Sequence, residues 1–169
     1  SNFLNLQDIE SIKEAFSKIF AKHGEIDGLI NCAGFLVVKD FKEHTPDEID
    51  SLIDINLKGL VYSCKFAKLK QGAHIVNISS SSFSKGRKGY GIYSATKAAV
   101  VNFTQALSEE YPDLKINVII PQRTNTKLRR DNFPDESSEN LLDPKIVAIN
   151  IVNLLKSENI TGSLIVVRK

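Results

Sequence analysis

Tyr93 and Lys97 stand four residues apart in the run Tyr-Ser-Ala-Thr-Lys. On a helix, this spacing places two side chains on one face, one turn from each other. A free phenol with a pKa of about 10 is a poor acid–base catalyst at neutral pH, but a neighbouring ammonium group favours the phenolate and lowers that pKa. The pair therefore predicts a site that exchanges a proton with the oxygen of a carbonyl or an alcohol.

Two further residues give this pair a context, because Tyr-x-x-x-Lys alone occurs by chance on many helices. Ser80 lies 13 residues before Tyr93, after an apolar run, and its hydroxyl could hold a substrate oxygen beside the phenol. Asn56, taken alone, is better interpreted as an amide that satisfies backbone groups where its helix bends. Neighbouring serines, Ser79 among them, are interpreted as loop residues.

Composition limits the classes of protein that this chain can represent. Its 169 residues fit one domain, and a hydrophobic fraction of 42% is ordinary for a globular protein. A net charge of +2 gives no broad basic surface, and no apolar run reaches the length of a membrane span. We therefore expect a cytoplasmic protein without nucleic-acid or membrane partners. Cys32 and Cys64 lack metal-ligand spacing and are expected to be buried thiols, so no metal site is expected.

Helical and strand patterns alternate along the chain, which predicts an α/β fold with a mostly parallel sheet. Strands are expected at Leu29–Ala33, His74–Ile78, Lys115–Ile120 and Leu164–Val167. Helices are expected from residue 9 to Gly24, from Thr45 through Leu60, from 93 to 111 and from 144 to 156, with long loops at 79–91 and 122–140. Gly34, Ser80 and Pro121 then follow three strands at one sheet edge, where ligands bind in open α/β folds. His23 is expected at a helix end, His44 in a surface loop and His74 at the start of a strand.

The run Asn31–Gly34, together with Asn56, Ser80 and Tyr93-x-x-x-Lys97, resembles the short-chain dehydrogenase/reductase family in order and spacing over essentially the whole chain. The resemblance implies a Rossmann-type doubly wound parallel sheet and an NAD(P)-dependent oxidoreductase. Tyr93 would be the acid–base residue, and Lys97 would bind the cofactor ribose and lower the pKa of Tyr93. Ser80 would bind the substrate oxygen, and Asn56 would hold a water that relays protons from Lys97 to solvent.

The resemblance also implies a set of cofactor contacts, with NADP favoured over NAD. Asn5 stands where the family usually has Asp, and Cys32 stands where a second Asn is commonest. The implied cofactor-binding residues are Asn5, Leu6, Asn31, Ala33, Gly34, Tyr93, Lys97, Pro121, Thr124 and Thr126.

One departure from the family is the lack of its Gly-rich turn, whose backbone amides hold the cofactor pyrophosphate. Gly24, Gly28 and Gly34 do not lie in a strand–turn–helix setting of that kind. The strand Leu29–Ala33 would then be a bare, apolar sheet edge, which proteins avoid. We therefore expect residues 1–169 to be the C-terminal two-thirds of a single domain that lacks its N-terminal strand–helix portion, and to be a fragment of a longer polypeptide.

A second departure is the basic run that follows Pro121, where the family has its substrate loop. The expected substrate residues are Ser80, Arg123, Lys127, Arg129 and Arg130; the four cations indicate either a solvated loop or an anionic substrate. This run is similar to the reductase part of enzymes that form CDP-ribitol. That similarity implies reduction of D-ribulose 5-phosphate to D-ribitol 5-phosphate with NADPH, and fusion to a cytidylyltransferase.

Three alternatives stay open at this point. The chain could belong to a reductase of another polar carbonyl, to a relative that binds cofactor or partners without turnover, or to an inactive truncated form. In each case the family implies a homodimer or homotetramer that associates through the helices carrying Asn56 and Tyr93.

Overall fold

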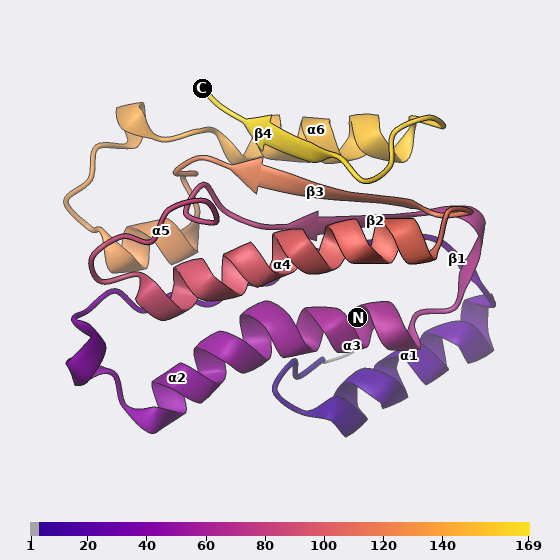
Figure 1. Ribbon diagram of the computed structural model, residues 1–169, viewed down its shortest axis with the longest axis horizontal. Helices are drawn as coiled ribbons and strands as arrows, with labels where there is room; N and C mark the ends of the chain where they lie inside the picture. The colour runs from indigo at the N-terminus through magenta and orange to yellow at the C-terminus, as the bar shows by residue number, and fades with distance from the viewer. Residues whose placement is uncertain (1–3) are drawn as a thin grey trace.

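The computed structural model describes residues 4–169, which form a four-stranded parallel sheet with helices on both faces (Figure 1). Strand order follows the chain, so each strand pairs with the next. The strands are β1 (Ile26–Asn31), β2 (Leu69–Ile78), β3 (Lys115–Pro121) and β4 (Leu164–Val167). This arrangement confirms the expected Rossmann-type α/β class.

The helices connect the strands and cover the sheet. Helices α3 and α4 contact strands on one face, α6 packs against β2, β3 and β4 on the other, and α1 packs against α3. The α-helices are α1 (Ile9–His23), α2 (Pro46–Ile53), α3 (Gly59–Phe66), α4 (Gly91–Glu110), α5 (Lys127–Asn132) and α6 (Pro144–Leu155), with a π turn η2 (Asp54–Lys58) and the 3-10 turns η1 (Phe41–Glu43) and η3 (Ser138–Asn140).

Local sequence signals account for several helix ends. Gly24 ends α1 with a φ of 71°, a conformation that favours glycine. Thr45 and Glu48 form the expected capping box of α2, since each side chain accepts a hydrogen bond from the backbone N–H of the other. Asp143 caps α6, with Pro144 in its first turn.

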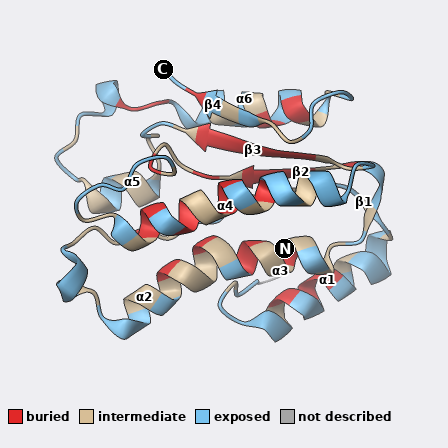
Figure 2. Ribbon diagram, in the orientation of Figure 1, coloured by how far each residue is buried: buried red, intermediate tan, exposed pale blue. Residues whose placement is uncertain are grey.

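The core lies on both sides of β2 and β3, whose central residues are buried (Figure 2). Ile119 points to the cluster beneath α6, while Val118 and Ile120 point to the cluster beneath α3 and α4. This alternation follows from the two-residue period of a strand. A chain of buried amides also crosses the sheet: Asn31 donates to Asn77 (2.8 Å), and Asn77 donates to Thr104 on α4 (3.0 Å).

Strand β1 forms one edge of the sheet among the described residues, as its pairing with β2 alone requires. The side chain of Ile30 is 43% exposed there. The expected edge strand is therefore present. It begins at Ile26 rather than Leu29 and ends at Asn31 rather than Ala33.

Several expected elements differ from the structure. β2 begins at Leu69 rather than His74. Its first half is polar, which concealed the strand in the sequence pattern, and it pairs with β1 through an irregular register. The helix expected from Thr45 through Leu60 continues without a break through the π-helical segment at 54–58 and ends at Phe66. The expected loop 122–140 contains α5 and η3; α5 is only six residues long and is held by tertiary contacts rather than by an apolar period.

The two cysteines differ in their exposure to solvent. Cys32 is exposed, contrary to the prediction, because it lies beyond the end of β1. Cys64 is shielded, and burial raises the pKa of its thiol to about 12.

Candidate active site

Tyr93 and Lys97 lie in the first two turns of α4, which starts two residues earlier than expected and so carries both side chains on a rigid element. Both are buried, at 9% and 3% exposure, and the ammonium nitrogen of Lys97 is 5.7 Å from the centre of the Tyr93 ring. The predicted pair on one helix face is therefore confirmed. The Lys97 ammonium also donates to the carbonyl of Ile78 at the end of β2 (3.0 Å).

Ser79 and Ser80 attach the loop after β2 to this pair. The Ser79 hydroxyl donates to the backbone carbonyl of Lys97 (2.8 Å), a structural contact that the interpretation of Ser79 as a loop residue missed. The Ser80 hydroxyl lies close enough to the Tyr93 phenol to lower its pKa, as expected for a group beside the reacting oxygen. Ser82 is buried and donates to the Ser80 hydroxyl (3.2 Å), which orients it.

The electrostatics of the pair differ from the expectation. Burial raises the pKa of Tyr93 above its ordinary value, and the nearby Ser80 hydroxyl and the charge of Arg129 only partly oppose this. Burial likewise lowers the pKa of Lys97 to about 8. The predicted lowering of the Tyr93 pKa is therefore not found, because desolvation of the phenol outweighs the neighbouring charges.

Asn56 is fixed by two hydrogen bonds to one backbone unit. Its carbonyl oxygen accepts from the N–H of Phe35 (2.9 Å), and its amide donates to the carbonyl of Phe35 (2.8 Å). Asn56 is 1% exposed and lies in the π turn, and its amide does satisfy backbone groups. These groups belong to the loop after β1, which Asn56 thereby holds against the site.

Gly34 lies where this loop meets the buried amine. A side chain at Gly34 would place its first carbon 3.5 Å from the Asn56 carbonyl oxygen and 3.9 Å from the Lys97 ammonium. Gly34, Asn56 and Lys97 therefore converge on one small space at the carboxyl end of the sheet.

The other expected cofactor residues are spread around this edge. Asn31 belongs to the buried amide chain, and Pro121 ends β3. Thr124 donates to the carbonyl of Gln122 (2.7 Å), and Thr126 caps α5. Asn5 caps its own turn by accepting from Gln7 (3.1 Å).

Leu6 and Ala33 complete this set. Leu6 packs so closely on Gly59 that a side-chain carbon at Gly59 would lie 2.8 Å from it. Ala33 is exposed in the loop after β1. Of the expected cofactor residues, Gly34 and Lys97 adjoin the space beside Asn56, and Tyr93 lies next to Lys97.

The four cations of the substrate segment have distinct partners. Arg123 and Arg129 both bind Glu136, at 2.9 and 2.5 Å. Lys127 pairs with Asp131 one helical turn away and is 83% exposed, and Arg130 binds the side chain of Asn125 (2.7 Å). Only Arg123 and Arg129 are thus brought together.

Three residues of this region were not predicted. Tyr90 accepts a hydrogen bond from Arg129 (3.0 Å), its ring stacks on Phe133, and it lies edge-on to Tyr93 at 6.2 Å. Its position three residues before Tyr93 could have indicated it, because that spacing shares a helix face. Phe133 belongs to the run that is similar to the CDP-ribitol-forming enzymes, but its stacking was not predicted, and nothing in the sequence pattern singles out Glu136.

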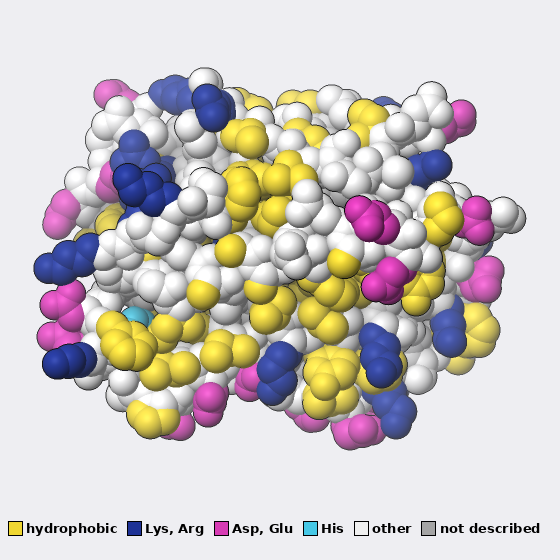
Figure 3. Space-filling view, in the orientation of Figure 1, with side chains coloured by type: hydrophobic (Ala, Val, Ile, Leu, Met, Phe, Trp, Pro, Cys, Tyr) yellow, Lys and Arg dark blue, Asp and Glu magenta, His cyan; other side chains and the backbone are white. Residues whose placement is uncertain are grey.

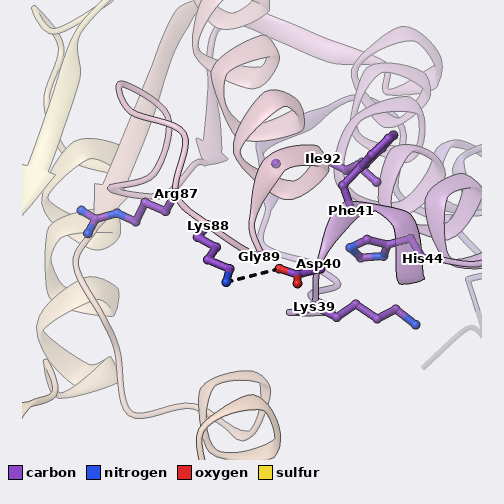
Figure 4. Close-up of a pocket in the computed structure, with 9 residues that line it drawn as sticks. Lys39, Asp40, Phe41, His44, Arg87, Lys88, Gly89 and Ile92 are labelled. Atoms are coloured by element: carbon purple, nitrogen blue, oxygen red, sulfur yellow. Dashed lines mark ion pairs between the residues drawn. The ribbon is translucent and has the colours of Figure 1, made fainter.

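A small hollow of about 280 Å³ lies beside the site, between the loops at 39–44 and 87–92 (Figure 4). Lys88 and Asp40 face each other across it at 3.8 Å. His44 lies in a loop as expected, between η1 and α2, but its side chain is only 3% exposed, and its Nδ1 has no hydrogen-bond partner among the described residues.

Two features are absent from the described part of the chain. No group of three or more His, Cys, Asp or Glu side chains there could hold a metal ion. None of its helices combines the length and the apolar character needed to cross a membrane.

The chain belongs to the short-chain dehydrogenase family, whose model matches residues 3–137. A Haemophilus influenzae protein described as the bifunctional ribulose 5-phosphate reductase/CDP-ribitol pyrophosphorylase Bcs1 is 40% identical over 98% of this chain. The chain spans only 36% of that relative. Carbonyl reductase family member 4 of Xenopus tropicalis is 31% identical over 92% of the chain, which covers 71% of that protein.

Solved structures agree with the fold. A short-chain dehydrogenase/reductase described as glucose/ribitol dehydrogenase from Brucella melitensis has a TM-score of 0.89 at 28% identity, covering 96% of this chain and 71% of its own. A short-chain dehydrogenase from Burkholderia cenocepacia in complex with NADP also has a TM-score of 0.89, at 21% identity, with 97% of this chain and 73% of its own covered. At that identity the second likeness supports the fold alone.

Proposed function

We propose that the protein containing this chain is an NAD(P)-dependent reductase of a carbonyl group, with Asn56, Ser80, Tyr93 and Lys97 as its catalytic residues. The observation that carries the proposal is the buried phenol of Tyr93, which lies beside the Ser80 hydroxyl and one helical turn from a buried ammonium. Ser80 would bind the carbonyl oxygen, and Tyr93 would give that oxygen its proton. Lys97, with a pKa of about 8, would remain charged at neutral pH beside the phenol.

The residues present fit one end of a nicotinamide cofactor. The Lys97 ammonium has three hydrogens, and one bond to Ile78 is found among the described residues, so two donors remain for ribose hydroxyls. When bound, the cofactor would supply the hydride. The described residues contain no Gly-rich strand–turn–helix of the kind that holds the cofactor pyrophosphate in the family. NADP is favoured over NAD by the family resemblance.

The substrate that we propose is D-ribulose 5-phosphate, reduced to D-ribitol 5-phosphate. The 40% identity to the Haemophilus influenzae relative supports this choice, as do the two converging guanidinium groups of Arg123 and Arg129. The same relative supports fusion to a cytidylyltransferase in the whole protein, and residues 1–169 would then form part of a single reductase domain.

We further propose a homodimer through α3 and α4. A shallow apolar groove runs between these helices, and hydrophobic side chains gather over them on the face shown in Figure 3. Its apolar lining comprises Leu57, Val61, Tyr62, Ala99, Phe103 and Ala106. The family resemblance favours a second copy of this surface as the occupant.

The experiment that tests the function is oxidation of NADPH by the full-length protein with ribulose 5-phosphate, compared with neutral ketones. We expect turnover with the phosphorylated sugar. The variant Tyr93→Phe should lose activity by about 10²-fold or more, because general acid catalysis contributes on that scale. A full rate for Tyr93→Phe would contradict the proposed proton donor.

The same assay separates the alternatives. Turnover of other polar carbonyls but not ribulose 5-phosphate would keep the reductase and change the substrate. NADPH binding without turnover of any carbonyl would favour a relative that only binds cofactor. Intact mass of the natural protein would establish whether the sequence is a fragment.

A further inference from the structure

Glu136 binds both arginines of the substrate segment. Its carboxylate accepts from Nε and Nη2 of Arg129, at 2.5 and 2.9 Å, and from Nη1 of Arg123 at 2.9 Å. This two-point contact is the geometry in which a guanidinium group binds a carboxylate or a phosphate. The carboxylate therefore occupies the position on Arg129 that an external anion would take.

Arg129 lies close to the reacting phenol. Its Nη1 donates to the hydroxyl of Tyr90, and the Tyr90 ring lies 6.2 Å from the ring of Tyr93. The guanidinium also stacks 3.7 Å above the ring of Phe133, which fixes its plane. Its charge lowers the pKa of Tyr93, so Arg129 and the phenol interact electrostatically.

The other cations of the segment are less suited to select a substrate. The ammonium of Lys127 is 83% exposed and bound to Asp131, and Arg130 is exposed and bound to Asn125. The side chains of Arg129 and Glu136, by contrast, are only 15% and 16% exposed. A charge pair that is partly shielded from water is stronger and more selective than an exposed one.

We propose that Glu136 is an internal competitor for the substrate: its carboxylate holds the guanidinium fork of Arg129 until the anionic group of the substrate displaces it. Arg129 is then the residue that selects an anionic carbonyl substrate, and Glu136 sets the affinity. This inference rests on the proposed reductase function. Glu136 lies in a bend between α5 and η3, so its carboxylate can withdraw without the loss of a helix.

The test is Glu136→Gln in the full-length protein, assayed with ribulose 5-phosphate and with ribulose, which lacks the phosphate. We expect the KM for ribulose 5-phosphate to fall about 3- to 10-fold, since a competing charge pair is removed, and the KM for ribulose to stay unchanged. Glutamine keeps the size of the side chain and a weaker hydrogen bond to Arg129. The matched control is Glu139→Gln, an equal charge change at an exposed residue, which should change neither value.

A different result is expected if Glu136 only holds Arg129 in a fixed position and is never displaced by the substrate. In that case Glu136→Gln would raise both KM values together or leave both unchanged, and either outcome would overturn the proposal.

A second readout does not need turnover. Inorganic phosphate should raise the thermal unfolding midpoint of Glu136→Gln more than that of the wild-type protein, and Glu136→Gln/Arg129→Gln should lose this effect. An equal rise of the unfolding midpoint in the wild-type protein and both variants would refute the role of Glu136 as a competitor. If no carbonyl is reduced, the reductase function fails while the phosphate measurement still decides the role of Glu136.

Discussion

At the scale of residues, the site holds a lysine whose charge is costly to bury. Lys97 is 3% exposed, and its ammonium has one hydrogen-bond acceptor among the described residues, the carbonyl of Ile78. Burial lowers its pKa from 10.5 to about 8, which means that the folded state disfavours the charged form. Below a pH of about 8 both the folded and the unfolded chains are protonated, so the penalty is present in full. Between about 8 and 10.5 only the unfolded chain holds the proton, so this penalty decreases as pH rises.

We therefore expect Lys97→Met to abolish carbonyl reduction and to stabilise the fold at pH 7. The shift corresponds to roughly 3 kcal/mol, from which about 1 kcal/mol is subtracted for the unpaired Ile78 carbonyl. Urea unfolding at pH 7 and pH 10 measures the effect, which should shrink at the higher pH. Lys42→Met, at an exposed residue, is the control. Equal destabilisation by Lys97→Met at both pH values would contradict the burial penalty.

At the scale of elements, the π turn and the loop after β1 form one unit. Asn56 binds Phe35 through both ends of its amide, and Gly34 keeps open the space between Asn56 and Lys97. A water in that space could connect the Lys97 ammonium with the second lone pair of the Asn56 oxygen, as the family resemblance implies. A side chain at residue 34 would fill the space at ordinary contact distances without a clash.

Gly34→Ala should consequently separate activity from stability. Turnover should fall because the water is displaced, while the free energy of unfolding should stay equal or rise by roughly 0.5–1 kcal/mol, since alanine restricts the unfolded chain. Steady-state kinetics and denaturant unfolding measure the two quantities. Gly86→Ala, whose added carbon meets nothing within 4 Å, serves as the control. Unchanged turnover in Gly34→Ala would argue against a relay through this space.

The sequence predicted the helices and strands better than the tertiary contacts between side chains. The capping box at Thr45 and the glycine at 24 are local signals, and both ends that they mark are found in the structure. Spacing alone also placed Tyr93 and Lys97 on one helix face. The helix α5 and the role of Glu136 depend on contacts with residues that are distant in the sequence, such as Tyr90. A periodic pattern of apolar residues cannot predict such contacts. The pKa of Tyr93 was misjudged because desolvation depends on the packing of the whole cluster.

At the scale of the whole molecule, the groove between α3 and α4 is an open surface with an apolar lining. The groove between α3 and α4 lies on the same two helices that support Asn56 and Tyr93, through η2 and the start of α4. A second copy packed there would restrain both helices, so association and catalysis would be coupled.

We expect Phe103→Glu to convert the proposed dimer to monomer, because a charge would be buried at the centre of the groove. Sedimentation velocity of the full-length protein measures the change, and NADPH oxidation should fall with the dimer fraction. The control is Phe41→Glu, the same substitution at a side chain that is 71% exposed and outside the groove. A dimer that persists in Phe103→Glu would assign the interface to another surface.

The amide chain from Asn31 through Asn77 to Thr104 also decides how the strands can align during folding. Asn31 and Asn77 are directly opposite in the register of β1 and β2. Displacing β1 by one residue would place Asn31 opposite Val76 or Ile78 and leave both amides without each other, at a cost of about 1–3 kcal/mol for each buried polar group left unpaired. The hydrogen bond between these two amides thus favours a single alignment of the edge strand β1. The native alignment of β1 also places Gly34 and Phe35, which follow this strand, beside Asn56. Pairing of β1 with β2 therefore helps to assemble the proton-transfer site.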